Sequence, residues 1–250
     1  MSAVLQTRNL VKTFGGITAT DDITFSLEKG ARHALIGPNG AGKTTFVNLL
    51  TGVLQPTGGA VILNGEDITT LSREVRVKRG MARTFQINQL FATMTPLQMI
   101  ALVTSERLGY GLRAFNVLDH DPRVIEQTAD ILARFRLEDI MNETIASLPY
   151  GKQRQVEIAS TFAAQPSVLL LDEPAAGVPE AERRELLDIV AALPADVSVL
   201  LIEHDMDIIF RFATRITVLV NGRVLADGDP VSIARDPAVR EAYLGEESHA

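Results

Sequence analysis

Cysteine is absent from this sequence of 250 residues. Disulfide bonds, thiolate zinc sites and cysteine nucleophiles are therefore excluded together, and a chain of this length can bury a sizeable core without such crosslinks. Basic residues are also in deficit, because 24 lysines and arginines face 31 aspartates and glutamates, giving a net charge of −7. This balance argues against a surface that neutralises nucleic-acid phosphates, so no nucleic-acid partner is expected.

Long apolar runs are missing as well. Apolar stretches such as SVLLL and VSVLLI are far shorter than the roughly 20 residues of a membrane helix. The first residues, MSAVLQTRNLVKTF, lack a basic segment followed by an apolar one, which argues against a secretory signal. We therefore expect a chain that is soluble by itself and lies in the cytoplasm.

Strands and helices alternate through most of the chain. The patterns predict strands in VLQTRNLVKTF, ITFSL, ARHALIG and AVILNG, and a helix that begins within GKTTFVNLLTG and stops at Gly52. The runs SVLLLDEP and VSVLLIEH are typical of buried parallel strands, and EAERRELLDIVAAL is typical of a helix. The segment RITVLVNGRVLADG predicts a hairpin that turns at Asn221 and Gly222.

Helical periodicity replaces these strand patterns between about residues 95 and 148. Ile125, Ala129, Leu132 and Phe135 fall on one face of a predicted helix there. The expected fold is α/β: a P-loop NTPase core with a mixed sheet, an N-terminal antiparallel β subdomain and an inserted α-helical subdomain. We expect one domain over residues 1–250, with its core in 1–94 and 165–250 and the helical subdomain in 95–164.

A glycine-rich loop lies between the strand ARHALI and the helix FVNLL. It matches the pattern G-x-x-x-x-G-K-[ST], and the predicted phosphate-binding residues are Gly37, Pro38, Asn39, Gly40, Ala41, Gly42, Lys43, Thr44 and Thr45. Gly40 and Gly42 let successive N–H groups turn inward around an anion at a helix N-terminus. In this mechanism Lys43 reaches the β- and γ-phosphates of a nucleotide, and the Thr44 hydroxyl is a ligand of Mg²⁺. An ordinary glycine-rich turn would need neither residue.

Polar residues end the two predicted parallel strands. Asp172 is the expected second anchor of Mg²⁺, and Glu173 is placed to polarise an attacking water. His204 ends the next strand, and ligands of open α/β sheets bind at this carboxyl edge. Simpler alternatives are a strand that ends in solvent for Asp172 and a polar strand terminus for His204. Gln86, in RTFQ, is either a surface glutamine or a ligand that senses Mg²⁺.

Together, GPNGAGKTT, RTFQ, LPYGKQRQVEIA, LLLDEP and IEHD resemble the ATP-binding subunits of ABC transporters over nearly the whole chain. The resemblance implies an ABC ATPase that hydrolyses ATP with Mg²⁺. It makes Phe14 the residue that stacks on adenine, Gln86 the Q-loop glutamine, Glu173 the catalytic glutamate and His204 the switch histidine. Lys43 joins these catalytic residues, and the metal ligands are Thr44, Gln86 and Asp172. The signature segment that serves the opposing chain's ATP is Leu148, Pro149, Tyr150, Gly151 and Lys152.

A narrower likeness involves ARTFQ, FATMTPLQ, YGKQRQVEIA, DEPAAG and VREAYLGEE, which resemble the ATPases of branched-chain amino acid importers. It implies a second, different ATPase chain, two membrane permease subunits and a periplasmic substrate-binding protein. The chain is then expected on the cytoplasmic face of the inner membrane, held through the permeases. Importers of urea, amides or aromatic acids share these motifs. A soluble ABC ATPase without a membrane partner is a further alternative, but such proteins generally carry tandem cassettes, long coiled-coil insertions or cysteine chemistry.

Two details of the resemblance affect the expected partners. The family signature is usually L-S-G-G-Q, and Pro149 replaces the serine whose hydroxyl contacts the γ-phosphate in the opposing site. The segment QINQLFATMTPLQMI is expected to receive a permease helix. Its apolar residues Phe91, Met94, Leu97 and Met99 either pack inside or form an exposed partner site.

Overall fold

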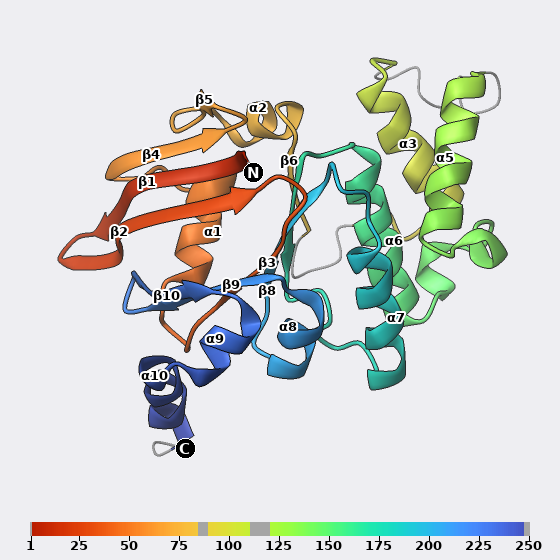
Figure 1. The fold of residues 1–250 in the computed structure, drawn as a ribbon. Helices are drawn as coiled ribbons and strands as arrows, with labels where there is room; N and C mark the ends of the chain where they lie inside the picture. The colour runs from red at the N-terminus through yellow and green to blue at the C-terminus, as the bar shows by residue number, and fades with distance from the viewer. Residues whose placement is uncertain (1, 85–89, 111–120, 248–250) are drawn as a thin grey trace. The chain divides into compact units, whose positions relative to one another are not determined.

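The computed structural model describes residues 2–84, 90–110 and 121–247, and the statements below refer to this part of the chain. The chain divides into two compact units. The first unit contains Met1–Met81, Ser167–Glu173 and Pro194–Ala250, and the second contains Ala82–Pro166 and Pro174–Leu193. Figure 1 labels the helices and strands of both units.

An antiparallel sheet with the strand order β2-β1-β4-β5 belongs to the first unit. β1 (Ala3–Phe14) and β2 (Ile17–Glu28) form a long hairpin that closes at the pair Phe14 and Ile17. β4 (Gly58–Leu63) pairs with β1, and the short β5 (Glu66–Asp67) pairs with β4. The predicted N-terminal strands are confirmed, although β2 begins at Ile17 and not at Ile23, where the predicted segment ITFSL starts.

The second sheet is mixed and has the order β10-β9-β3-β8-β7-β6. β3 (Arg32–Ile36) runs parallel to β8 (Ser198–Ile202) and β9 (Arg215–Val220), and β7 (Val168–Asp172) runs parallel to β8. β10 (Arg223–Gly228) returns antiparallel to β9, and β6 (Met81–Arg83) is the opposite edge. Asn221 and Gly222 both have positive φ angles, 49° and 76°, as the predicted tight hairpin requires. The predicted α/β class with a mixed sheet is confirmed.

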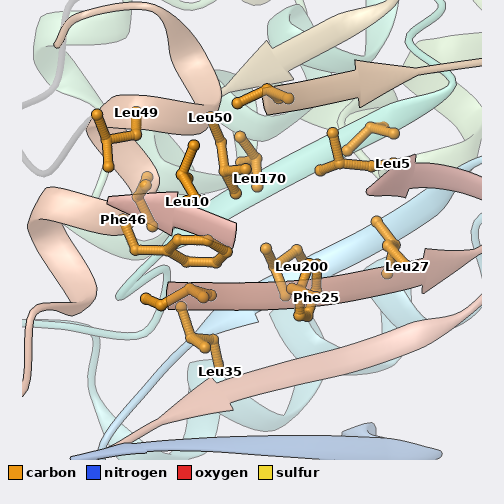
Figure 2. Packing of buried hydrophobic residues seen from close by; sticks show 14 of the residues in the cluster. Leu5, Leu10, Phe25, Leu27, Leu35, Phe46, Leu49, Leu50, Leu170 and Leu200 are labelled. Atoms are coloured by element: carbon orange, nitrogen blue, oxygen red, sulfur yellow. The ribbon is translucent and has the colours of Figure 1, made fainter. Parts of the chain in front are cut away.

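Helix α1 (Lys43–Thr51) packs into the core of the first unit, and Gly52 ends it in the left-handed conformation, as predicted. Apolar side chains from both sheets and from α1 meet there, as Figure 2 shows. The labelled residues of this cluster are Leu5, Leu10, Phe25, Leu27, Leu35, Phe46, Leu49, Leu50, Leu170 and Leu200. Burying them fixes the strand ends and the loop between β3 and α1.

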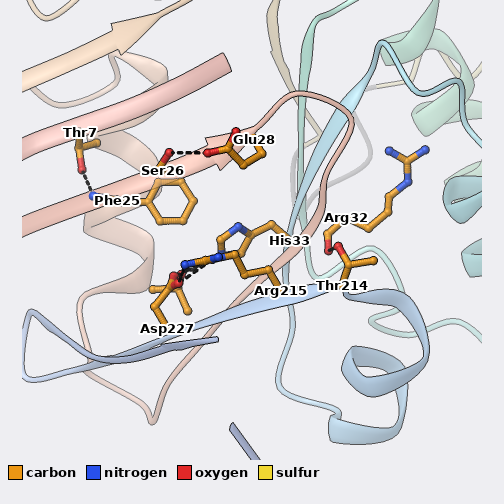
Figure 3. Close-up of polar contacts among 10 residues, drawn as sticks. Thr7, Phe25, Ser26, Glu28, Arg32, His33, Thr214, Arg215 and Asp227 are labelled. Carbon is orange, nitrogen blue, oxygen red and sulfur yellow. Dashed lines mark hydrogen bonds and ion pairs between the residues drawn. The ribbon is translucent and has the colours of Figure 1, made fainter. Parts of the chain in front are cut away.

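One polar side chain of β3, that of His33, is buried close to this apolar cluster. His33 is fully buried, and its Nε2 lies 2.8 Å from the Thr217 hydroxyl, which in turn contacts the Asp227 carboxylate. Figure 3 shows His33 close to Asp227 and Arg215. Because a carboxylate accepts hydrogen bonds, Thr217 donates to Asp227 and accepts from His33 Nε2–H. Burial, with a smaller effect of the nearby Arg215, lowers the pKa of His33 to about 4, although the opposite charge of Asp227 raises it. The imidazole is therefore neutral at neutral pH.

The second unit is mainly helical. It contains α3 (Pro96–Arg107), α5 (Pro122–Arg134), α6 (Tyr150–Ala163) and α7 (Glu180–Ala191), with short 3₁₀ turns at Glu138–Ile140 and Ile145–Ser147. Thr95 and Gln98 form a capping box at the start of α3, where helical periodicity was predicted to begin. The unit contains Ala82–Pro166 and Pro174–Leu193 and so includes α7. The predicted bounds of the helical subdomain, 95–164, stay a prediction.

The buried face of α5 differs from the predicted one. Val124, Thr128, Ile131 and Leu132 are buried, whereas Ile125 is 50% exposed and Ala129 is exposed. The predicted face is therefore wrong at Ile125 and Ala129. The reason is that Thr128 packs inward, although its hydroxyl made it look polar, and this rotates the buried stripe by about one residue.

Three further helices belong to the first unit. The chain continues through α8 (Met206–Phe212), α9 (Pro230–Arg235) and α10 (Pro237–Glu247). The first two begin at the aspartates Asp205 and Asp229, whose carboxylates accept N–H groups of the first turn. A further short helix, α2 (Arg73–Lys78), follows β5. Among the described residues, no helix is both long and apolar enough to span a bilayer.

Candidate nucleotide site

The glycine loop joins β3 to α1 in the first unit, and close backbone contacts explain its glycines. A Cβ atom on Gly37 would lie 2.1 Å from the carbonyl oxygen of Leu219, and one on Gly42 would lie 2.4 Å from that of Ala19. Gly40 has open space around it, so only its φ of 78° favours glycine. The loop is therefore held between β2 and β9 by contacts that a larger residue would break.

Lys43 begins α1 and folds back over the loop. Its Nζ donates to the carbonyl of Gly37 and, at 2.9 Å, to that of Pro38. Within the described chain, no side chain caps the N-terminus of α1, so its first N–H groups face the loop. The other loop residues differ in exposure: Asn39, Gly40 and Thr44 are exposed, Pro38 and Thr45 are half-buried, and Ala41 is buried. The loop thus offers backbone donors and an ammonium group to an anion.

Asp172 and Glu173 lie at the carboxyl end of β7. Asp172 is 6% exposed, and parallel pairing places it level with Ile202 at the end of β8. Glu173 has a φ of 46°, which is uncommon for a residue with a side chain, and its N–H donates to the Ile202 carbonyl at 2.9 Å. Such a conformation costs on the order of 1 kcal/mol and clusters at functional sites.

His204 follows β8 and lies beside two carboxylates. Its Nδ1 is 3.7 Å from Glu173 Oε1 and 3.9 Å from Glu203 Oε2, while 70% of its side chain is exposed. The His204 N–H donates to Glu203 Oε2 at 3.3 Å. Sequence reasoning missed Glu203, which is 3% exposed. The signal in the sequence was the position of Glu203 beside His204 in IEHD. The burial of Glu203, however, depends on how β8 pairs within the sheet.

Oxygen donors suited to Mg²⁺ lie at this edge of the sheet. Thr44 has a hydroxyl in the first turn of α1, and Asp172 has a carboxylate at the end of β7. β8 lies between β3 and β7, so the strand that leads into the loop and the strand that ends in Asp172 have parallel directions. Hydroxyl and carboxylate oxygens are hard ligands and fit Mg²⁺. Gln86, the third predicted ligand, lies outside the described residues.

Phe14 ends β1 and is 46% exposed. The hairpin that carries it touches the glycine loop, because Ala19 of β2 approaches Gly42. The Gly222 N–H also donates to the Ala41 carbonyl at 3.0 Å, and the Asp21 N–H donates to the Gly222 carbonyl at 2.8 Å. The β1–β2 hairpin that carries Phe14 therefore packs directly against the glycine loop.

The segment 148–152 belongs to the second unit and begins α6. Pro149 is the N-cap residue of this helix, and it offers neither a side-chain cap nor a backbone N–H. Leu148 is buried, Tyr150 is 42% exposed, and Lys152 Nζ donates to Gln155 at 3.0 Å. Gly151 is buried, and a Cβ atom there would lie 1.8 Å from Oε2 of Glu182, so a larger residue requires this carboxylate to move.

The glycine loop, the paired carboxylates and the histidine define a P-loop nucleotide-binding protein. A family model described as ABC transporter matches residues 20–176, and one described as branched-chain amino acid ATP-binding cassette transporter matches residues 223–249. The chain therefore belongs to the ABC transporter family of ATP-binding proteins, and it is an ATPase. The family resemblance found in the sequence is confirmed.

Similar proteins support the same assignment. The chain is 37% identical to the high-affinity branched-chain amino acid transport ATP-binding protein BraF of Pseudomonas aeruginosa, over 97% of this chain and 98% of the relative. It is also 37% identical to LivG of Escherichia coli K12, with the same description and the same coverage. A crystal structure of MJ1267, an ATP-binding cassette of an ABC transporter in its ADP conformation, is 30% identical with a TM-score of 0.84, and the match covers 98% of this chain and 100% of that one.

Proposed function

We propose that this chain is the ATP-hydrolysing subunit of an importer for branched-chain or other hydrophobic amino acids. The observation that carries the proposal is the match of residues 223–249 to the branched-chain amino acid cassette model, on a chain with a complete phosphate loop. BraF and LivG, both described as branched-chain amino acid transport proteins, are similar over nearly their full lengths. The substrate itself is selected by other subunits.

In the proposed site, the loop N–H groups and the positive end of α1 hold the phosphates of ATP. Lys43 exchanges its loop carbonyls for the β- and γ-phosphate oxygens, to which it makes charge-assisted hydrogen bonds. Thr44, Asp172 and Gln86 hold Mg²⁺, which neutralises charge on the phosphates when bound. Asp172 lies at the carboxyl end of β7, and its carboxylate oxygens are of the hard kind that Mg²⁺ prefers.

Glu173 is the proposed group that orients and polarises the attacking water. His204 Nδ1 lies 3.7 Å from Glu173 Oε1, so the histidine is beside this carboxylate in the proposed site. The left-handed turn at Glu173 supports a functional role, because strain of this kind persists where the surrounding structure enforces it. Phe14 is the proposed stacking platform for adenine.

Two such chains would close face to face, and the segment 148–152 of each would complete the site of the other. The partners we propose are a second, different ATPase chain, two permease subunits and, indirectly, a periplasmic binding protein. The chain would then lie at the cytoplasmic face of the membrane. Phe91, which is 58% exposed, supports a permease-binding surface near α3, whereas Met94 and Leu97 are half-buried and Met99 is buried.

Purification with native partners tests this function. The tagged chain would be extracted from its own cells with mild detergent, and the co-purifying subunits would be identified and reconstituted in proteoliposomes. We expect leucine, isoleucine or valine, with the binding protein, to stimulate ATP hydrolysis, and a complex with Lys43→Ala to show no stimulation. Stimulation by urea, an amide or an aromatic acid alone would overturn the proposed substrate class. Purification of the chain without any membrane subunit would overturn the proposed importer function.

A further inference from the structure

A lysine covers part of the exposed aromatic ring at the end of β1. Lys12 Nζ lies 5.1 Å from the centroid of the Phe14 ring. The two residues are two positions apart on a strand, so their side chains leave the same face of the sheet. An ammonium group at this distance is attracted to the negative face of the ring. Phe14 is nevertheless 46% exposed, so the ring keeps surface that is open to a ligand.

The ammonium group of Lys12 has a second contact that fixes its position. Nζ donates to the Gln55 carbonyl at 2.7 Å. The neighbouring backbone is tied to β1 as well, because the Thr57 N–H donates to the Val11 carbonyl at 2.8 Å and the Thr13 N–H donates to the Thr57 hydroxyl at 3.1 Å. Lys12 therefore lies where hydrogen bonds join β1 to residues 55–57, a place that we call the β1 junction.

This junction is linked to the helix that begins in the phosphate loop. Residues 55–57 follow α1 closely, and the Leu54 N–H donates to the carbonyl of Asn48 in α1 at 3.0 Å. The contacts of Lys12 thus connect the aromatic ring to the same helix whose first residue is Lys43. A ring at the end of a hairpin has rotational freedom, and the cation restricts it by preferring the ring face.

We propose that Lys12 is a positioning residue for the nucleotide base: it occupies one face of the Phe14 ring, and adenine stacks on the other. This inference rests on the proposed role of Phe14 in nucleotide binding. Lys12 acts through the ring and makes no contact with the phosphates. Its contribution should therefore depend on the base of the ligand and on the presence of the ring.

The test compares the dissociation constants of ATP and inorganic tripolyphosphate, measured by calorimetry on the purified chain. Lys12→Met keeps most of the aliphatic stem and removes the charge, Lys12→Arg keeps a cation, and Lys29→Met makes the same charge change in an exposed turn. We expect Lys12→Met to weaken ATP binding about two- to fivefold, the range of exposed cation–π contacts, and to leave tripolyphosphate binding unchanged. Lys12→Arg should retain ATP affinity, and Lys29→Met should behave as wild type.

Two further results decide the inference. In a Phe14→Ala background, Lys12→Met should cause no additional loss of ATP affinity. An unchanged ATP affinity in Lys12→Met, or an equal loss for ATP and tripolyphosphate, would overturn the positioning role, and the second result would indicate a direct phosphate contact. Failure of the nucleotide site is distinguishable, because wild type and Lys43→Ala would then bind ATP equally weakly.

Discussion

Mild acid should destabilise this protein through one buried histidine, His33. Its pKa is lowered from 6.5 to about 4 in the folded chain, mainly because burial disfavours the charged imidazolium. Between these values the unfolded chain binds a proton that the folded chain excludes, so falling pH favours unfolding. The contribution of His33 to the free energy of unfolding is therefore fully present above about pH 6.5. It declines as the pH falls and is lost near pH 4.

The size of the effect follows from the same two values. A difference of about 2.5 pKa units corresponds to about 3 kcal/mol, or about 1.4 kcal/mol for each pH unit within this window. Proteins of this kind are stable by about 5–15 kcal/mol, so the loss is measurable. The 3.9 Å approach of Asp227 to His33 does not reverse the sign, because burial outweighs that attraction.

Chemical denaturation at several pH values between 4 and 7 measures how the free energy of unfolding depends on pH. His33→Gln keeps a donor for Thr217 and removes the titration, so the wild type should lose about 3 kcal/mol more than the variant across the window. Parallel slopes for wild type and His33→Gln would refute the reasoning.

Four substitutions test the nucleotide sites of the assembled transporter. Phe14→Ala should weaken the binding of ATP and GTP alike by about 1–3 kcal/mol, because stacking uses the face of a base, and unchanged affinities would place the base elsewhere. Lys43→Ala should weaken ATP binding by about 1.5–3 kcal/mol and abolish turnover, and retained turnover in the purified transporter would contradict the loop assignment. Pro149→Ser should accelerate hydrolysis at the site completed by this chain's signature, where a missing donor costs on the order of 100-fold. Because Pro149 removes that donor from only one of the two ATP sites, hydrolysis should be concentrated at the site that contains Glu173. Equal losses from Glu173→Gln and from its equivalent in the partner chain would reject this asymmetry.

Local chemistry explains which parts of the fold could be predicted. The glycine loop, the Asn221–Gly222 turn and the all-apolar strands β7 and β8 each carry their signal within a few residues. The apolar runs predicted buried parallel strands, and the rule that ligands bind at the carboxyl edge of such sheets then predicted that the residues after these strands share one site. Most of the candidate site residues were therefore predicted from patterns that depend little on distant contacts.

Features set by distant contacts were not predictable. The burial of Glu203 depends on β8 lying inside the sheet, and the left-handed turn at Glu173 depends on its hydrogen bond to Ile202. The rotated face of α5 depends on Thr128 packing among other helices of its unit. The ring contact of Lys12 requires the Gln55 carbonyl, which lies 43 positions along the chain. None of these partners is visible in a local sequence pattern.

ATP hydrolysis by the Glu173→Gln variant in the assembled transporter tests the proposed motor most directly. The amide keeps the size of the side chain and removes the carboxylate that polarises water, so we predict normal ATP binding and a rate about 100-fold or more below wild type. Glu180→Gln, on a side chain that is 83% exposed, should hydrolyse ATP as wild type. Wild-type hydrolysis by Glu173→Gln would contradict the proposed site and the mechanism built on it.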